Sequence, residues 1–279
     1  MENKLAYENR IIAFVDILGF QTILNKTQLK DADGGLADNE SCIFDLNKTF
    51  ERISDLMGAE EEPEDAVPSR QVTQFSDAIV ISFKVAESEK ELRYLFEELL
   101  FLHIELLRQE ILIRGGIAYG PLIHTGKVLF GPAMVQAYKV ESLAANSPRI
   151  ILPKSLTDIN SKISENIKGQ AQKLDDLITL DEDDFYYLDY FDKCQKPELN
   201  LFVNDAEYIN HLKQTKEVIL KGLKNIQPNI YNKYGWMKTK WNRTIKNNQS
   251  ANRLELLVKE KRNELHDFFS NAKPIKSSM

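Results

Sequence analysis

The sequence predicts a mixed α/β protein of the α+β type, with a sheet domain over residues 1–196 and a helical extension over residues 197–279. Three observations favour this division. Apolar runs bounded by charge, such as Arg10–Asp16, are typical of strands that are covered on both faces. The leucine-rich stretch after Ser88 begins with a capping box and keeps helical spacing. Further segments with helical spacing follow Pro197, which predicts the extension.

The composition is that of an ordinary globular protein, with 279 residues, 43% hydrophobic, 28% charged and a formal net charge of −6. Nothing in this balance favours nucleic-acid binding. Cys42 and Cys194 are far apart and form no metal-binding or disulfide framework, which fits a reducing compartment. The first residues do not form a secretory signal, and no apolar run approaches the roughly 20 residues of a membrane span. We therefore expect a cytoplasmic protein that does not insert in a membrane.

Two aspartates stand alone in apolar surroundings where predicted strands end. Asp16 lies in Phe14–Phe20 (FVDILGF), and Asp77 lies at a hairpin tip in Gln74–Ser82 (QFSDAIVIS). Each could cap its own turn. A buried aspartate without a cation would lose its charge, however, so two of them favour a shared divalent ion or pair of ions. Oxygen ligands suit Mg²⁺ or Mn²⁺, and two such ions clamp an in-line displacement at phosphorus.

A third element is a strand that ends in arginine and glycine. It leads to Arg114, and Gly115 and Gly116 after it let the chain pass close to a ligand or to another backbone. The alternating residues Ile117–Phe130 predict a hairpin that bends at residues 120–121 and turns at residues 125–126. With the two aspartates, this arginine strand predicts a metal–triphosphate site.

The remaining segments have weaker patterns. Lys26–Glu40 is polar and predicts a loop, Lys154–Leu180 predicts an amphipathic helical region, and Phe185–Phe191 predicts a strand. Lys213–Lys246 contains nine Lys or Arg residues against a single acid. This stretch is either a solvated helix face or a cationic wall that attracts an anionic substrate or partner. The four histidines have no metal-ligand spacing, and we expect them at the surface or half-buried.

The motifs resemble those of the class III nucleotidyl cyclases, in the same order from about Asn9 to Leu152. FVDILGF resembles their first metal motif, and QFSDAIVIS resembles the second, at a hairpin tip. ILIRGGIAYGPLIHTGKVLFG resembles their arginine strand, and GPAMVQAYKVESLA resembles the helix that carries their transition-state residues. The resemblance implies a βαββαβ sheet that works as a homodimer with active sites at the interface.

The resemblance also implies roles for individual residues. Asp16 and Asp77 would hold two Mn²⁺ or Mg²⁺ ions, with the carbonyl of Ile17 as a further ligand. Arg114 would contact the triphosphate of a nucleoside triphosphate substrate. The backbone N–H groups of residues 18–20 would cradle the same phosphates.

The chain departs from the family pattern at the transition-state helix. The family's Asn–Arg pair falls on Val135 and Lys139. Lysine supplies charge but not the planar fork of arginine. Either Lys139 takes the catalytic role, or Gln136 or Arg149 does so from nearby, or Lys139 is an ordinary exposed residue.

A second departure concerns the base. The pair that reads purines in adenylate cyclases falls on Thr73 and Val128, which cannot make those contacts. The chain looks closest to the pyrimidine cyclases of the Pycsar anti-phage defence system. That resemblance implies a uridylate cyclase that converts UTP to 3′,5′-cyclic UMP and pyrophosphate. Thr73 would read the base, and Phe20 or Phe75 would pack near it.

Two other functions stay open at this point. The product could be cyclic CMP made from CTP, because a hydroxyl such as that of Thr73 both donates and accepts hydrogen bonds. The chain could also be a catalytically degenerate dimer that binds a nucleotide and regulates a partner. In the preferred interpretation the cyclic nucleotide is a second messenger that activates a separate effector protein.

Overall fold

The computed structural model describes residues 6–30, 36–58, 69–84, 90–156 and 176–276. Its centre is an eight-stranded sheet with the order β4-β5-β1-β6-β8-β10-β9, to which β7 is added as a third partner of β6. All pairs are antiparallel except β6 with β8. The strands are β1 (Glu8–Ile17), β4 (Gln71–Phe75), β5 (Ala78–Lys84), β6 (Ile113–His124), β7 (Leu129–Phe130), β8 (Ile150–Leu152), β9 (Ile178–Leu180) and β10 (Tyr186–Leu188).

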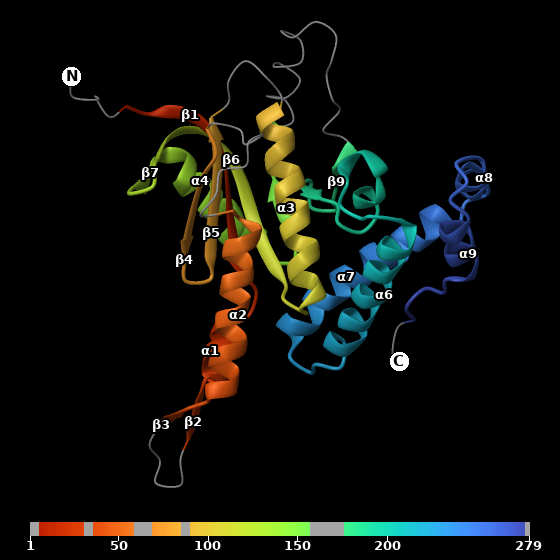
Figure 1. Ribbon diagram of the computed structural model, residues 1–279, viewed down its shortest axis with the longest axis horizontal. Helices are drawn as coiled ribbons and strands as arrows, with labels where there is room; N and C mark the ends of the chain where they lie inside the picture. The colour runs from red at the N-terminus through yellow and green to blue at the C-terminus, as the bar shows by residue number, and fades with distance from the viewer. Residues whose placement is uncertain (1–5, 31–35, 59–68, 85–89, 157–175, 277–279) are drawn as a thin grey trace, which may run out of the picture.

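The central strand β1 has both faces covered, as its continuous apolar run predicts. Ile11, Ala13 and Val15 point into the main core, whereas Ile12 and Phe14 point to the opposite face. The main core lies under the long helices α2 (Glu40–Leu56) and α3 (Lys90–Arg108) (Figure 1). The opposite face is covered by α4 (Pro132–Ala144). This confirms the α+β class.

The helix α4 lies unusually close to β6. A Cβ atom on Gly116 would be 2.4 Å from the carbonyl oxygen of Ala137 and 2.6 Å from the backbone nitrogen of Glu141. Only glycine allows this approach. Of the two partners that the sequence suggested for the Gly115-Gly116 pair, the structure therefore places another backbone against Gly116.

The bend expected at residues 120–121 is present, within a strand that continues through it. Ser82 lies in line with Ala118 of β6, yet Nδ1 of His124, six residues further along β6, is 2.8 Å from Oγ of Ser82, so the strand bends back over the sheet while it stays paired with β1.

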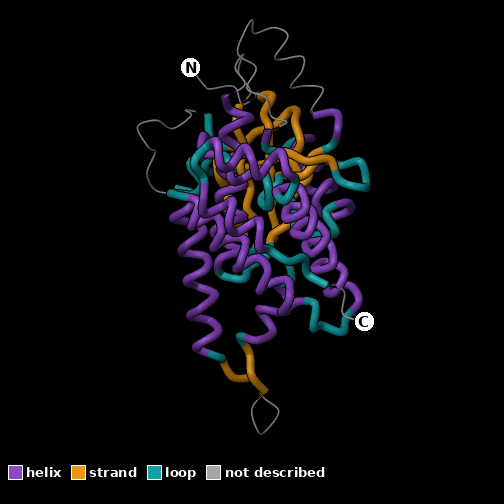
Figure 2. The backbone as a smooth tube through the Cα atoms, turned by 90° about the vertical axis from the view of Figure 1, so that its right-hand side faces the viewer, coloured by secondary structure: helices purple, strands orange, loops and turns teal. Residues whose placement is uncertain are grey.

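Two other expectations from the sequence are wrong in detail. The predicted loop 26–40 contains a two-stranded ribbon, β2 (Gln28–Lys30) and β3 (Leu36–Asp38), which projects from the body in Figures 1 and 2. Residues 178–180, expected in a helical region, form β9, which pairs with β10. Residues 157–175 lie outside the described residues.

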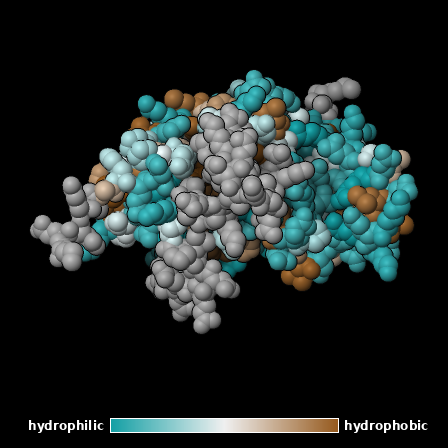
Figure 3. All heavy atoms as spheres, turned by 90° about the horizontal axis from the view of Figure 1, so that it is seen from above, coloured by the Kyte–Doolittle hydropathy of each residue, from teal (hydrophilic) through white to brown (hydrophobic). Residues whose placement is uncertain are grey.

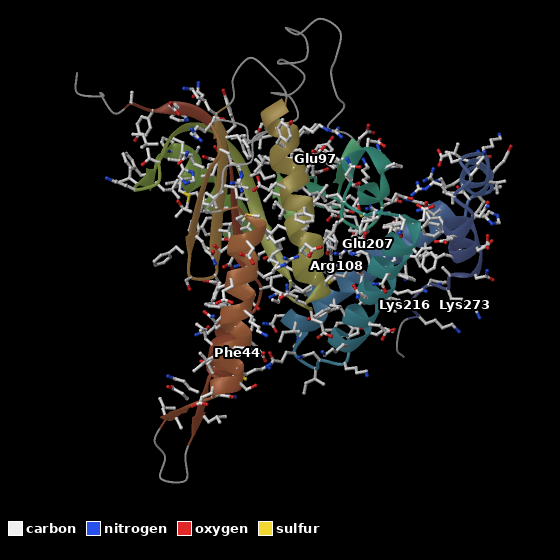
Figure 4. All side chains as sticks on the ribbon, in the orientation of Figure 1. Phe44, Glu97, Arg108, Glu207, Lys216 and Lys273 are labelled. Carbon is white, nitrogen blue, oxygen red and sulfur yellow. The ribbon has the colours of Figure 1, made fainter. Side chains whose placement is uncertain are left out.

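The C-terminal segment is helical, as predicted, and its visible face at the right of Figure 3 is mostly hydrophilic. Buried residues of this segment, such as Leu212 and Trp241, belong to the same core cluster as the sheet. In Figure 4, Arg108 of α3 meets Glu207 of α6, and their side chains form an ion pair of 2.7 Å. The elements are η2 (Lys193–Gln195), η3 (Pro197–Leu199), α6 (Asp205–Gly222), α7 (Pro228–Asn248), α8 (Ala251–Lys259) and α9 (Asn263–Asn271).

None of the described helices is both long enough and apolar enough to cross a bilayer.

Candidate functional site

The two aspartates predicted to act together do meet. Asp16 lies near the end of β1, opposite Ala78 of β5 and Arg114 of β6. Asp77 lies in the tight turn between β4 and β5, where Ser76 adopts a φ of 54°. Strand alternation puts the side chain of Asp16 on the face that α4 covers. The turn and the strand end therefore bring both carboxyl groups to one place.

The carboxyl group of Asp16 titrates unusually. Burial, together with a side-chain hydrogen bond and the charge of Asp77, raises its pKa to about 6. Arg114 opposes this rise with a hydrogen bond from Nη2 to Oδ2 of Asp16 over 3.2 Å. Two carboxyl groups that share a site repel each other when both are ionised, so a cation bound between them would stabilise their charged forms. Their donor set fits a hard divalent cation such as Mn²⁺ or Mg²⁺.

A third carboxyl group, which the sequence interpretation missed, completes the cluster. Glu141 of α4 is only 2% exposed, and its Oε1 lies 2.7 Å from Nε of Arg114. The N–H direction does not satisfy hydrogen-bond geometry, so this contact is an ion pair. Burial raises the pKa of Glu141 to about 7, a net value that includes an opposing effect of the Arg114 charge and smaller raising effects of Asp16 and Asp77.

The sequence contained a signal for Glu141. Ala133, Ala137 and Glu141 follow one another at four-residue spacing, so they share the helix face that points inward. An acid that continues a buried alanine stripe needs a cation nearby. The arginine strand could have supplied that cation.

A lysine from the far end of the chain also belongs to this region. Burial lowers the pKa of Lys233 in α7, the charge of Arg114 lowers it further, and Asp16 opposes the shift. Trp236, one turn later in α7, and Val140 of α4 both pack against the buried cluster that contains Ile151. That packing brings α7 alongside the end of α4. Lys233 belongs to the basic stretch 213–246, so part of this stretch is not a solvated face.

Two of the predicted site residues are engaged elsewhere in the fold. Phe20 is buried in the main core, where its ring packs edge-on against Phe50 at 5.8 Å, so it is not available to a base. Arg149 is 4% exposed and pairs with Asp181 and Asp183. The expected roles of Phe20 in binding and of Arg149 in catalysis are therefore corrected.

The backbone around Ile17 offers less than the resemblance implied. The Ile17 side chain is buried in the core, which leaves its carbonyl group as its one possible ligand atom. The N–H of Leu18 donates to the carbonyl of Leu112 over 2.8 Å, so it does not cradle a phosphate. Gly19, in the left-handed region at φ 78°, precedes the short helix α1 (Phe20–Lys26).

The base-reading residues lie in the same part of the sheet. Thr73 is half-buried on the edge strand β4, and its Oγ1 is 2.9 Å from Nε2 of His124. Val128 lies in the turn after His124 and is 41% exposed. Phe75 is 79% exposed beside this face. Three of the four histidines, contrary to expectation, are buried, and His124 is one of them.

Lys139 lies on the outer side of α4. It is exposed, as are Val135 and Tyr138, which are 53% and 52% exposed. Glu141 points to the opposite side of the same helix. Lys139 therefore faces away from the carboxyl groups of its own chain.

No group of three or more His, Cys, Asp or Glu side chains is arranged to hold a metal ion in the described residues. A cleft of about 1360 Å³ lies among the C-terminal elements and is lined by residues such as Asp192, Arg253 and Arg262. None of the site residues lines that cleft, and some of its charges are paired within it, as in the contact of Arg262 with Asp205.

Comparison with known proteins adds nothing to this geometry. No protein-family model matches the chain, and a search of curated proteins found no similar sequence.

Proposed function

We propose that two copies of the chain form a nucleotidyl cyclase, which converts UTP to 3′,5′-cyclic UMP and pyrophosphate. The observation that carries this proposal is the meeting of Asp16, Asp77 and Arg114 on one face of the sheet. Two carboxylates and a guanidinium are complementary to two cations and a triphosphate.

Asp16 and Asp77 would hold Mn²⁺ or Mg²⁺. When bound, these ions lower the pKa of the ribose 3′-hydroxyl group and neutralise charge on the phosphates. The raised pKa of Asp16 supports this assignment, because a cation would restore the charge that burial and Asp77 disfavour.

The reaction joins the ribose 3′-oxygen to the α-phosphorus while the bond from that phosphorus to pyrophosphate breaks. Negative charge then gathers on the pyrophosphate oxygens, and cations placed there in advance lower the barrier. Arg114 would turn from Asp16 to these oxygens, since it is 26% exposed and tied to Asp16 by a single hydrogen bond. Glu141 would hold the other edge of the guanidinium, and Lys233 would add a second cation from α7.

A homodimer would complete the site. Lys139 and Val135 form an exposed surface on the outer side of α4, Tyr138 is half-exposed at the flank of the helix, and Phe75 adds an exposed ring at the β4–β5 hairpin. Because Lys139 points away from the carboxyl groups of its own chain, it would act in the site of the partner. Mixing Asp16→Ala with Lys139→Ala chains tests this: heterodimers would regain up to about a quarter of the wild-type activity by symmetry. No rescue in verified heterodimers would place both groups in one chain or remove Lys139 from catalysis.

Cyclic CMP is the alternative product. A nucleotide-binding dimer without turnover is a second candidate, favoured by the apolar Val135 where a transition-state asparagine would stand. Whether the product is cyclic UMP or cyclic CMP, it would act in the cytoplasm on a separate effector protein.

A single assay separates these functions. Purified protein is incubated with equimolar ATP, GTP, UTP and CTP and Mn²⁺, and cyclic products are identified by mass. Cyclic UMP is the expected product, and cyclic CMP would correct only the base. Cyclic AMP or cyclic GMP as the main product would refute the pyrimidine assignment, and binding without any product would favour the regulatory dimer.

A further inference from the structure

Four polar side chains form a continuous row of hydrogen bonds across the sheet. Nε of Arg10 donates to Oγ of Ser82 over 2.9 Å, and this oxygen is 2.8 Å from Nδ1 of His124. The other ring nitrogen, Nε2, is 2.9 Å from Oγ1 of Thr73. Arg10, Ser82 and His124 are buried, and Thr73 is half-buried. The row thus runs from a buried cation to a hydroxyl group at the edge of the sheet.

The position of the hydrogens along this row follows from its buried end. The guanidinium of Arg10 is always protonated, so Oγ of Ser82 accepts. Ser82 is fully buried, so its hydroxyl hydrogen needs an acceptor. Among the described residues that acceptor is Nδ1 of His124. Burial, with the charge of Arg10, lowers the pKa of His124 to about 4, so the ring is neutral near pH 7. A neutral imidazole carries one hydrogen, which must then lie on Nε2.

This assignment fixes the role of Thr73. The N–H at Nε2 of His124 donates to Oγ1 of Thr73, so the hydroxyl hydrogen of Thr73 cannot point at the ring. The described part of the chain offers this hydroxyl group no other hydrogen-bond partner. Because Thr73 is half-buried on the face that carries Asp16, its hydrogen is available to a bound molecule.

Thr73 and Asp16 are separated by about the length of a nucleotide. Thr73 pairs with Val80 and Asp16 pairs with Ala78, two residues earlier in β5. Two residues along the strands and two strands across give a Cα separation of about 12 Å. A nucleotide with its phosphates beside Asp16 would bring the far edge of its base to Thr73.

We propose that the row Arg10–Ser82–His124 makes Thr73 a hydrogen-bond donor and thereby selects uracil over cytosine. The inference rests on the proposed function and names the base for that site. Uracil carries a carbonyl oxygen at ring position 4, where cytosine carries an amino group. The hydroxyl hydrogen of Thr73 pairs with that oxygen. The amino group of cytosine could use only the second lone pair of Oγ1, which would leave the hydroxyl hydrogen of Thr73 unpaired. Thr73 is the specificity-determining residue, and Ser82 and His124 are positioning residues.

The test is the ratio of cyclic UMP to cyclic CMP made from equimolar UTP and CTP. We expect wild type to favour UTP by about tenfold, the difference that one net hydrogen bond supplies. His124→Phe removes the N–H that orients the hydroxyl group of Thr73, which can then rotate to present its hydrogen or a lone pair to the base, so the ratio should fall toward one. His124→Gln should retain the preference, because its amide N–H can replace that of Nε2. His266→Phe makes the same change on α9, away from the row, and should leave the ratio unaltered.

Three outcomes would overturn the inference. They are a wild-type preference for CTP, an equal use of both nucleotides, and an unchanged ratio in an active His124→Phe protein. If wild type makes no cyclic product at all, the proposed function fails separately. Calorimetric titration with UTP and with CTP then measures the same preference, and equal affinities would refute it.

The hydrogen assignment can also be tested without any substitution. Nitrogen-15 chemical shifts of the His124 ring distinguish the two neutral tautomers. We expect the hydrogen on Nε2, and a ring protonated at Nδ1 would remove the basis of the proposal.

Discussion

Replacing Gly116 with alanine should force α4 away from the sheet. The new Cβ atom would lie 2.4 Å from the carbonyl oxygen of Ala137, where ordinary contacts begin at 3.4 Å. The atoms it meets include backbone atoms of α4, so rotation of a side chain cannot relieve the overlap. The helix or strand must shift by about 1 Å, and overpacking of this kind costs ~1–3 kcal/mol.

The same shift should reduce turnover, because α4 holds Glu141 against Arg114. A misplacement of about 1 Å can lower an enzyme's rate by ~100-fold. Urea unfolding measures the lost stability, and cyclic-nucleotide production per folded protein measures the lost activity. Gly126→Ala is the matched control, since no atom lies within 4 Å of its Cβ position. If Gly116→Ala matches this control in both stability and turnover, the close packing of α4 is not as described.

Three other predictions concern buried charge. Burial lowers the pKa of His103 to about 3 and that of His211 to about 4, with the charge of His211 adding to the shift of His103. Below pH ~6.5 these histidines bind protons in the unfolded chain but not in the folded one. The free energy of unfolding therefore falls as the pH is lowered from ~6.5 toward 4, by ~1.4 kcal/mol per pH unit for each histidine. His103→Phe should flatten this dependence of the urea midpoint, and an unchanged slope would contradict it. Lys240→Met should cost ~3 kcal/mol because it removes a buried partner of Asp181, and an unaltered melting temperature would show that Arg149 alone suffices. Lys233→Gln should raise KM for the triphosphate several-fold without affecting the fold, whereas an unchanged KM would exclude its contact with phosphate.

The sequence was a good guide wherever a local pattern determines the structure. The local sequence predicts the strand β1 from its continuous apolar run, and it predicts the turn at Ser76-Asp77 from the apolar segments on either side. Neither prediction requires knowledge of a distant segment. The residues at 120–121 behave in the same way. Glycine before proline favours a bend locally, and β6 bends there, which brings His124 back to Ser82. That the strand continues through the bend depends instead on its pairing with the distant strand β1.

The site shows the same division. Asp16, Asp77 and Arg114 come together as predicted, because each lies at or next to a strand end in one sheet. Glu141 was within reach of sequence reasoning through its four-residue spacing from Ala137. Lys233 was not, since its place depends on how α7 packs against α4, more than ninety residues earlier in the sequence. The commitment of Arg149 to Asp181 likewise depends on a distant segment.

The central claim is that Asp16 and Asp77 support cyclisation of a pyrimidine nucleotide. The most direct measurement is the yield of cyclic UMP from UTP and Mn²⁺, determined by mass for wild type, Asp16→Asn and Asp77→Asn. Each substitution keeps the size of the side chain and removes its charge, so the circular dichroism spectrum should not change. The account predicts cyclic UMP from wild type and a loss of ~100-fold or more in both variants. Comparable yields from wild type and either folded variant would contradict it.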